Sequence, residues 1–186
     1  MDKVYIDKVL KGDHNAFQYF VKTYQEYAYS ISFATLKDAH LAEDAVQEAY
    51  IKAFRGLKKF RGEAEFKTWL GRIVINESLK RVEKNKVETD FILDDSSYAS
   101  ANEIEFALSS LEQKDQKYFI TLVFERLKAN ESLALELFYL KEHSIAEIKE
   151  LTGWSDSKTK MLLMRGREQF YRKMKKILKS ELREII

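Results

Sequence analysis

Residues 144–170 read SIAEIKELTGWSDSKTKMLLMRGREQF and hold the start, the turn and most of the second helix of a helical pair. Ser144 and Glu147 have the spacing of a capping box, in which the two side chains satisfy the first free amides of a helix. Gly153 suits a left-handed helix end, and Ser155 or Asp156 can cap the helix that follows. A short helix, a turn with glycine and a long basic helix predict a helix-turn-helix.

The second helix of such a motif enters the major groove of DNA with its first residues at the base edges. Charge supports this role, because residues 158–183 contain 10 basic side chains and only 2 acidic ones. A helical hairpin with a solvated basic face is the alternative interpretation. The candidate groove residues are Ser157, Lys158, Lys160, Met161, Met164 and Arg165.

Two further helices are predicted upstream, over residues 117–140, where phenylalanines and leucines recur at helical spacing with a break near residue 129. Before them, residues 87–105 contain six carboxylates and neither lysine nor arginine, and residues 94–102 are small and turn-prone. We interpret 87–105 as an acidic flexible linker, with an ordinary surface loop as the alternative. The linker would join two helical domains, residues 1–86 and residues 106–186.

The first domain contains the clearest helical pattern in the chain, over residues 38–54. Leucine or alanine recurs every fourth residue from Leu41 to Ala53, beside Val46 and Phe54, so one face is apolar. Acidic side chains share the opposite face, which we interpret as a docking surface for a protein partner. A solvated face without a partner is the alternative. The residues of this acidic face are Glu43, Asp44, Gln47 and Glu48.

A basic stretch follows, with aromatic residues interleaved among its cations. Residues 52–86 contain 11 basic and 4 acidic side chains, and a further helix is predicted from about Glu65. Rings stack on unpaired bases while lysine and arginine follow phosphates, so the pattern suits single-stranded nucleic acid. Phe66 and Trp69 also fit plain core positions, and for Trp69 the core is the better interpretation.

Composition favours an all-α fold and excludes several kinds of chemistry. The 186 residues include no proline, no cysteine and only 6 glycines, while helix-forming residues abound. The lack of cysteine excludes disulfides, thiolate metal sites and thiol nucleophiles. No stretch of about 18 apolar residues could span a bilayer, so we expect a cytoplasmic protein without a membrane segment.

An enzymatic function is not expected. The three histidines, His14, His40 and His143, share no metal-ligand spacing. The chain also lacks a glycine-rich loop for nucleotide phosphates and a dinucleotide-binding turn. We therefore assign no catalytic residue, no metal and no cofactor.

Several of these motifs together resemble the extracytoplasmic-function (ECF) group of bacterial RNA polymerase sigma factors, in the sigma-70 family. In the first domain, GDHNAF at 12–17, AEDAVQEAY at 42–50 and the run from Phe60 through FKTWL at 66–70 to Asn76 are similar to the second conserved region of that family. In the second domain, SIAEI at 144–148, the turn at Gly153 and residues 160–167 resemble the fourth conserved region.

The resemblance implies a transcription initiation factor that binds core RNA polymerase, directs it to promoters and assists promoter melting. The acidic face would meet the clamp helices of the largest polymerase subunit, and the second domain would meet the flap of the second-largest subunit. The linker would thread the RNA-exit path. An anti-sigma factor is a further expected partner, and the protein would associate with the nucleoid.

The resemblance also implies a minus-10 site, in which the loop from Phe60 to Phe66 captures a flipped non-template base. Unstacking a base costs a few kcal/mol, which pocket contacts and ring stacking must offset. Neighbouring residues would hold the flanking strand and duplex. The full set of expected minus-10 residues is Phe60, Arg61, Gly62, Phe66, Lys67, Trp69, Arg72, Asn76, Lys80 and Arg81.

The second domain departs from the family pattern in its groove-reading helix, where Leu162 stands in place of a usual arginine. Leucine cannot make the bidentate contact that contributes roughly 1 to 3 kcal/mol of base discrimination. We therefore expect atypical minus-35 reading, or recruitment by another DNA-targeting partner. The alternatives are a free-standing helix-turn-helix regulator and a helical module that mimics a sigma factor without starting transcription.

Overall fold

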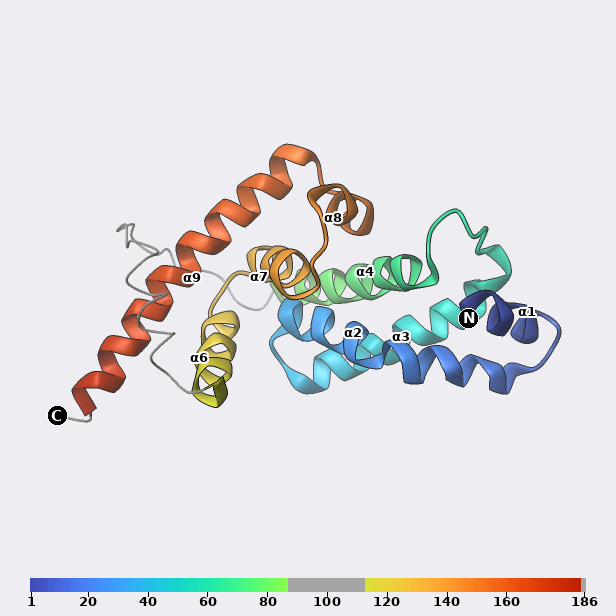
Figure 1. The fold of residues 1–186 in the computed structure, drawn as a ribbon, viewed down its shortest axis with the longest axis horizontal. Coiled ribbons are helices and arrows are strands. Elements are labelled where there is room, and N and C mark those ends of the chain that lie inside the picture. The colour runs from blue at the N-terminus through green and yellow to red at the C-terminus, as the bar shows by residue number, and fades with distance from the viewer. Residues whose placement is uncertain (87–112, 185–186) are drawn as a thin grey trace.

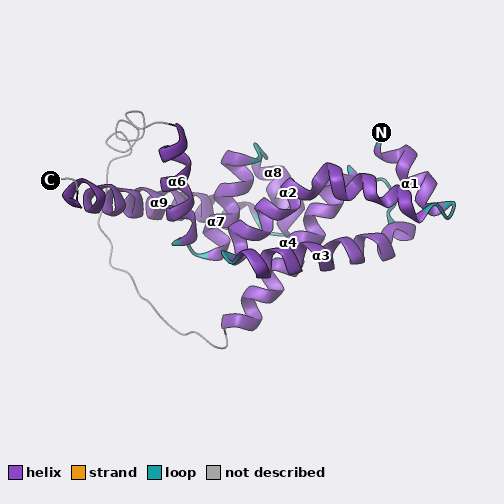
Figure 2. Cartoon of the chain, turned by 90° about the horizontal axis from the view of Figure 1, so that it is seen from below, coloured by secondary structure: helices purple, strands orange, loops and turns teal. Residues whose placement is uncertain are grey.

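The computed structural model describes residues 1–86 and 113–184, and all regular structure within them is helical (Figures 1 and 2). The predicted all-α class is therefore confirmed. The predicted linker, 87–105, and the predicted domain boundary at residue 106 lie outside the described residues. No helix in the described ranges is long and apolar enough to cross a membrane.

The first half of the chain forms a bundle of three long helices, with a short helix at one end (Figure 1). Tyr5 stacks on Tyr19 with 3.9 Å between ring centroids, and Asp2 accepts hydrogen bonds from Tyr19 and Tyr24, so the short first helix is held on the bundle. The elements are α1 (Asp2–Leu10), η1 (His14–Phe17), α2 (Gln18–Leu36), α3 (Ala39–Gly56), η2 (Leu57–Lys59) and α4 (Phe66–Lys86).

The apolar stripe predicted over residues 38–54 is confirmed as the buried face of α3. Ala45, Ala49 and Ala53 are fully buried, and their small side chains allow α3 to pack closely on α2 and α4. Asp38 caps the helix by accepting a hydrogen bond from the Leu41 amide at 2.8 Å. The acidic residues are therefore directed away from the bundle core.

The second half contains the helix-turn-helix, α8 (Ile145–Thr152) and α9 (Asp156–Glu184), preceded by α6 (Gln113–Glu125) and α7 (Ala129–Leu135). The capping box at Ser144 is confirmed, and Gly153 ends α8 in the left-handed region at φ 71°. Ser155 caps α9, because its hydroxyl accepts from the Lys158 amide at 3.2 Å.

The predicted break between two helices in residues 117–140 is confirmed, since α6 ends at Glu125 and α7 begins at Ala129. The second of these helices differs from the expectation, because it widens into a π turn at Glu136–Leu140. Glu136 is buried in this turn beside Lys141, whose ammonium lies 3.5 Å from the carboxylate. Burial raises the pKa of Glu136, and Lys141 opposes that shift.

The two halves are packed against each other, with α7 on α2 and α8 on α4. One cluster of buried side chains runs through both halves, including Ile31 and Leu70 from the first and Leu133 and Leu151 from the second. Lys37, in a left-handed conformation at the end of α2, extends this contact toward Glu131 of α7. Burial lowers the pKa of Lys37 to about 8.

Candidate nucleic-acid and protein interfaces

The acidic face of α3 borders a shallow groove between α2 and α3, with a volume of about 390 Å³. Glu43, Asp44 and Gln47 are exposed, and Glu48 is half-buried. The apolar lining of the groove includes Tyr50, whose buried hydroxyl has no hydrogen-bond partner in the described structure. The groove residues are Val21, Gln25, Glu26, Tyr29, Glu43, Val46, Gln47 and Tyr50.

Burial raises the pKa of Tyr50 to about 12, so the hydroxyl keeps its proton at neutral pH. A buried hydroxyl without a partner is costly to the fold. The groove thus combines an apolar floor and an acidic rim, which suits a basic amphipathic helix.

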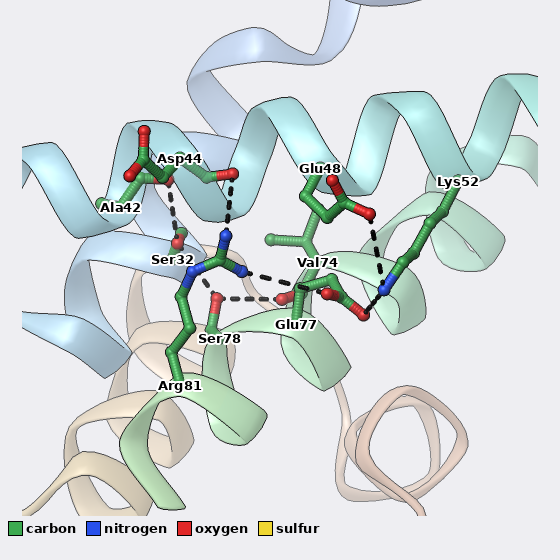
Figure 3. A network of polar contacts seen from close by, with 9 residues as sticks. All are labelled: Ser32, Ala42, Asp44, Glu48, Lys52, Val74, Glu77, Ser78 and Arg81. Atoms are coloured by element: carbon green, nitrogen blue, oxygen red, sulfur yellow. Dashed lines mark hydrogen bonds and ion pairs between the residues drawn. The ribbon is translucent and has the colours of Figure 1, made fainter. Parts of the chain in front are cut away.

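Polar contacts join this acidic face to α4 (Figure 3). Lys52 lies between two carboxylates, 3.8 Å from Glu48 and 2.6 Å from Glu77. Arg81 lies 3.9 Å from Glu77 and donates to the Asp44 carbonyl oxygen at 3.3 Å. Glu77, which was not among the expected site residues, therefore connects the predicted docking face with a predicted DNA-binding residue.

The loop before α4 is lined on its inner side by a cluster of three aromatic rings. Ring centroids of Phe60, Phe66 and Trp69 lie 5.0 to 6.0 Å apart, and Phe66 is only 2 % exposed. Phe66 thus occupies a core position, and Trp69 is half-buried against the same core. Arg61 and Gly62 are exposed in the loop.

The expected cations of α4 point in several directions. Lys67 lies over the ring of Tyr27, 4.7 Å from its centroid, and Arg72 forms an ion pair with Glu150 of α8 at 2.8 Å. Asn76 and Lys80 are exposed, whereas Arg81 turns toward α3. The structure therefore places part of the expected DNA surface against the second half of the chain.

The start of α9 presents a polar and cationic surface. Ser157, Lys158, Lys160, Met164 and Arg165 are exposed, whereas Met161 is half-buried and Leu162 is buried, at 7 % exposure, in the shared core. Lys158 lies over the Trp154 ring, 5.3 Å from its centroid.

Asp156 fastens the two helices of the motif together. Its carboxylate lies 2.9 Å from the Lys149 ammonium of α8 and 3.0 Å from the Lys160 ammonium of α9. Hydrogen bonds from these two lysines lower the pKa of Asp156, so its carboxylate is charged at neutral pH.

A second apolar groove, of about 230 Å³, lies where α6, the π turn and α9 meet. Two large side chains on its border, Tyr139 and Leu140, are half exposed, and Arg167 adds one cation. Among the described residues, no group of three or more histidines or carboxylates is placed to hold a metal ion.

Comparison with known proteins gives a family model and relatives that agree with one another. Residues 20–87 match the family model described as Sigma-70 region 2. The chain is 30 % identical over 187 residues to the ECF RNA polymerase sigma factor SigW of Bacillus subtilis, covering 94 % of this chain and 97 % of that protein. It is 43 % identical over 75 residues to the ECF RNA polymerase sigma-E factor of Escherichia coli, covering 40 % of this chain and 39 % of that protein.

Two solved structures share the fold. The sigma factor RpoE in complex with the anti-sigma factor NepR, from Bartonella quintana, matches with a TM-score of 0.63 and 20 % identity, over 86 % of this chain and 96 % of that one. CnrH in complex with the cytosolic domain of CnrY matches with a TM-score of 0.59 and 17 % identity, over 96 % of this chain and 97 % of that one.

Proposed function

The chain belongs to the ECF sigma factors of the sigma-70 family, and from this premise we propose that it uses three separate surfaces to bring core RNA polymerase to promoters and to open them. As a sigma factor it serves transcription initiation with RNA polymerase and is not an enzyme. The observation that carries the proposal is one helical bundle with an acidic docking groove on α2 and α3 and a basic, aromatic-lined edge on α4.

The first surface is the acidic face of α3, which docks on the clamp helices of the largest polymerase subunit. The exposed carboxylates of Glu43 and Asp44, with Gln47 and Glu48 beside them, supply charge complementary to a basic helix. The apolar groove next to them supplies contact area.

The second surface is the loop from Phe60 to Phe66 with α4, which captures and holds the melted minus-10 strand. Arg61 and Gly62 are exposed at the loop, and the rings of Phe60 and Trp69 form its wall. A flipped base gains stacking at such a wall, and phosphates of the strand pair with nearby cations. The flanking contacts come from Lys67, Arg72, Asn76, Lys80 and Arg81.

The third surface is the start of α9, for duplex DNA upstream. Lys158, Lys160 and Arg165 are exposed there, but Lys160 is already paired with Asp156 and Met161 is partly covered. The surface offers few free donors for base edges, which supports weak upstream reading or recruitment by another DNA-targeting partner.

The apolar groove at Tyr139 and Leu140 is the proposed site for the flap of the second-largest subunit or for an anti-sigma factor. Partially exposed aromatic and leucine side chains with one arginine are typical of the core of a protein interface. The protein acts in the cytoplasm at the nucleoid, where polymerase meets promoter DNA. We propose that residues 1–86 and 106–186 act as its two domains.

Reconstitution with core polymerase of the host bacterium tests the proposal. We expect co-migration with core and transcripts with defined 5′ ends on host DNA. Glu43→Lys should weaken core binding about tenfold, because it reverses a charge at the docking face. Asp7→Lys, an equal charge change at an exposed position of α1, should leave core binding unchanged. Binding to duplex DNA without binding to core would contradict the proposal and favour a free-standing regulator.

A further inference from the structure

The two halves of the chain meet in two places that differ in how closely they fit. Between α4 and α8 there is no gap, since a Cβ atom at Gly71 would lie only 3.0 Å from Cδ2 of Leu151. Where α2, α6 and the π turn come together, by contrast, a cavity of about 210 Å³ remains. Its lining is mostly apolar and includes the rings of Tyr29, Phe33 and Phe124.

This cavity is large enough for an organic molecule with one aromatic ring. An engineered apolar cavity of roughly 150 Å³ in another protein binds benzene. Tyr29 and Phe33 are stacked on α2, with ring centroids 5.9 Å apart and 19° between their planes. A flat ligand ring beside them can adopt the offset or edge-on geometry that aromatic pairs prefer.

One cation lines the cavity. Lys37 is half-buried and is the single lysine or arginine among the described residues of the lining. Within the described ranges, no carboxylate lies at ion-pair distance from its ammonium. Glu131 and Glu125 attract the ammonium from farther away, and Lys173 repels it. The lysine therefore carries a partly desolvated charge without an ion-pair partner in the described structure.

The backbone at Lys37 is also unusual for a residue with a long side chain. It ends α2 in the left-handed region at φ 61°, where glycine or asparagine is the usual residue. A side chain is disfavoured in that conformation, and such positions often serve binding rather than folding. The backbone strain and the unpaired ammonium both indicate a ligand.

The carboxylates that line the cavity do not neutralise Lys37. Glu136 is buried and is paired with Lys141 at 3.5 Å, while Glu125 is exposed to solvent. An anion that enters the cavity would give the Lys37 ammonium a charge-assisted hydrogen bond, and such bonds are strong where water is partly excluded.

We propose that this cavity, the Lys37 pocket, binds a small aromatic carboxylate, with the ring among Tyr29, Phe33 and Phe124 and the carboxylate on the Lys37 ammonium. The pocket shares Phe124 and Leu140 with the neighbouring groove at Tyr139, but Lys37 lines the pocket and not that groove. The site is thus additional to the surfaces assigned to polymerase and DNA.

NMR titration of the full chain with phenylacetate tests the proposal, and phenylacetamide is the matched neutral ligand. We expect phenylacetate to bind about tenfold more tightly, because a hydrogen bond between charged groups contributes more than one to a neutral group. The amide resonances of Phe33 and Ala34 should shift more than that of Arg167, which lines only the neighbouring groove. Equal affinities for the two ligands, no saturable binding, or larger shifts at Arg167 would each overturn the proposal.

Variants at Lys37 test the role of its charge. Lys37→Gln replaces the ammonium with a neutral amide, so phenylacetate and phenylacetamide should bind it equally. Lys22→Gln, the same exchange at an exposed position of α2, should keep the tenfold preference. Lys37→Arg keeps the charge and should also keep the preference. A preference for phenylacetate that persists in Lys37→Gln would show that another group binds the carboxylate.

Lys37→Gly gives a second route if Lys37→Gln does not fold. Glycine suits the left-handed conformation, so this chain should be at least as stable as the parent and should also lose the preference for phenylacetate. Circular dichroism checks the helix content of every variant. Core polymerase takes no part in these titrations, so their outcome is independent of the proposed function.

Discussion

Two buried serines link the three long helices of the first half at a single point. The Ser78 hydroxyl lies 3.0 Å from the Ser32 hydroxyl and 2.9 Å from the Val74 carbonyl oxygen, and Ser32 reaches the Ala42 carbonyl oxygen at 3.3 Å (Figure 3). Both serines are fully buried. Because no water replaces a lost partner there, each hydrogen bond matters more than one on the surface.

Ser78→Ala should therefore lower the free energy of unfolding by roughly 1 to 3 kcal/mol, since Ser32 loses a buried partner. Urea denaturation followed by circular dichroism measures this change. Thr23→Ala, at an exposed position of α2, serves as the control and should stay within about 0.5 kcal/mol of the parent chain. Equal stabilities for Ser78→Ala and Thr23→Ala would refute the expectation.

His143 should make the packing of the two halves depend on pH. Its side chain is 11 % exposed, and burial lowers its pKa, with Lys67 and Lys141 acting in the same direction and Glu147 opposing. A neutral ring can accept the Tyr27 hydroxyl hydrogen at Nε2. The packed state therefore favours the neutral imidazole.

The preference for the neutral imidazole decides how the packing of the two halves changes with pH. Packing should be at full strength above the ordinary histidine pKa of about 6.5 and should weaken as the pH falls through it toward the lower value. The free energy of unfolding, measured by urea denaturation at pH 7.5 and at pH 5.5, tests the effect. His143→Gln should remove this difference, and His40→Gln, at an exposed position, should keep it.

Residue identity alone indicated part of the site. The acidic side chains of α3 are exposed as their spacing predicts, because carboxylates opposite an alanine stripe have no other place. Tyr27, Gly71 and Glu77 gave no comparable signal, since their roles depend on partners far away in sequence. Leu162 stands in place of a usual arginine in the groove-reading helix, and its burial in the core explains why leucine is suitable there.

At the scale of elements, the stability of α8 depends on the hydrogen bonds of its first turn. Ser144 accepts from the Glu147 amide, and the Glu147 carboxylate accepts from the Ser144 amide and hydroxyl, both at 2.7 Å. These hydrogen bonds from Ser144 lower the pKa of Glu147. The helix has only 8 residues, so its ends carry a large share of its stability.

Ser144→Ala should cost about 1 kcal/mol of unfolding free energy, as for other lost N-caps. Thermal denaturation measures the loss, and Ser144→Thr should recover most of it, because a threonine hydroxyl can both accept from the Glu147 amide and donate to the Glu147 carboxylate. The contribution of Glu147 is present above the usual glutamate pKa and is lost as the pH falls through its lowered value. A Ser144→Ala chain as stable as the parent would contradict this account.

Helices were predictable from the sequence to within a few residues because their signals are local. The stripe of α3, the capping box of α8 and the glycine at its end all lie within one or two turns. The π turn at Glu136–Leu140 was not predictable, since an extra residue in a turn leaves the apolar spacing ambiguous. The sequence does not distinguish the buried Glu136 from a glutamate on the surface.

At the scale of the whole molecule, the continuous core predicts that both halves unfold together. Trp69 lies in the first half and Trp154 in the second. The fluorescence of a Trp154→Phe chain therefore reports on the first half, and that of a Trp69→Phe chain reports on the second. We expect coincident denaturation midpoints for the two probes in the closed chain. Clearly different midpoints for the two probes would argue against a shared core.

The packing of the halves could not be predicted from the sequence. Charge distribution allowed acidic and basic surfaces to meet, but at physiological salt such attraction is screened beyond about 8 Å. The contact is instead set by apolar fit, with Leu70, Leu133 and Leu151 in one cluster. Such pairings between distant segments leave no periodic trace along the chain.

The absent side chain at Gly71 also matters for how the chain changes over generations. A glycine codon becomes an alanine codon through a single base substitution, without altering any side chain that contacts DNA or polymerase. A single base change at this codon therefore alters the packing of α8 on α4 and leaves every other side chain of the protein as it is.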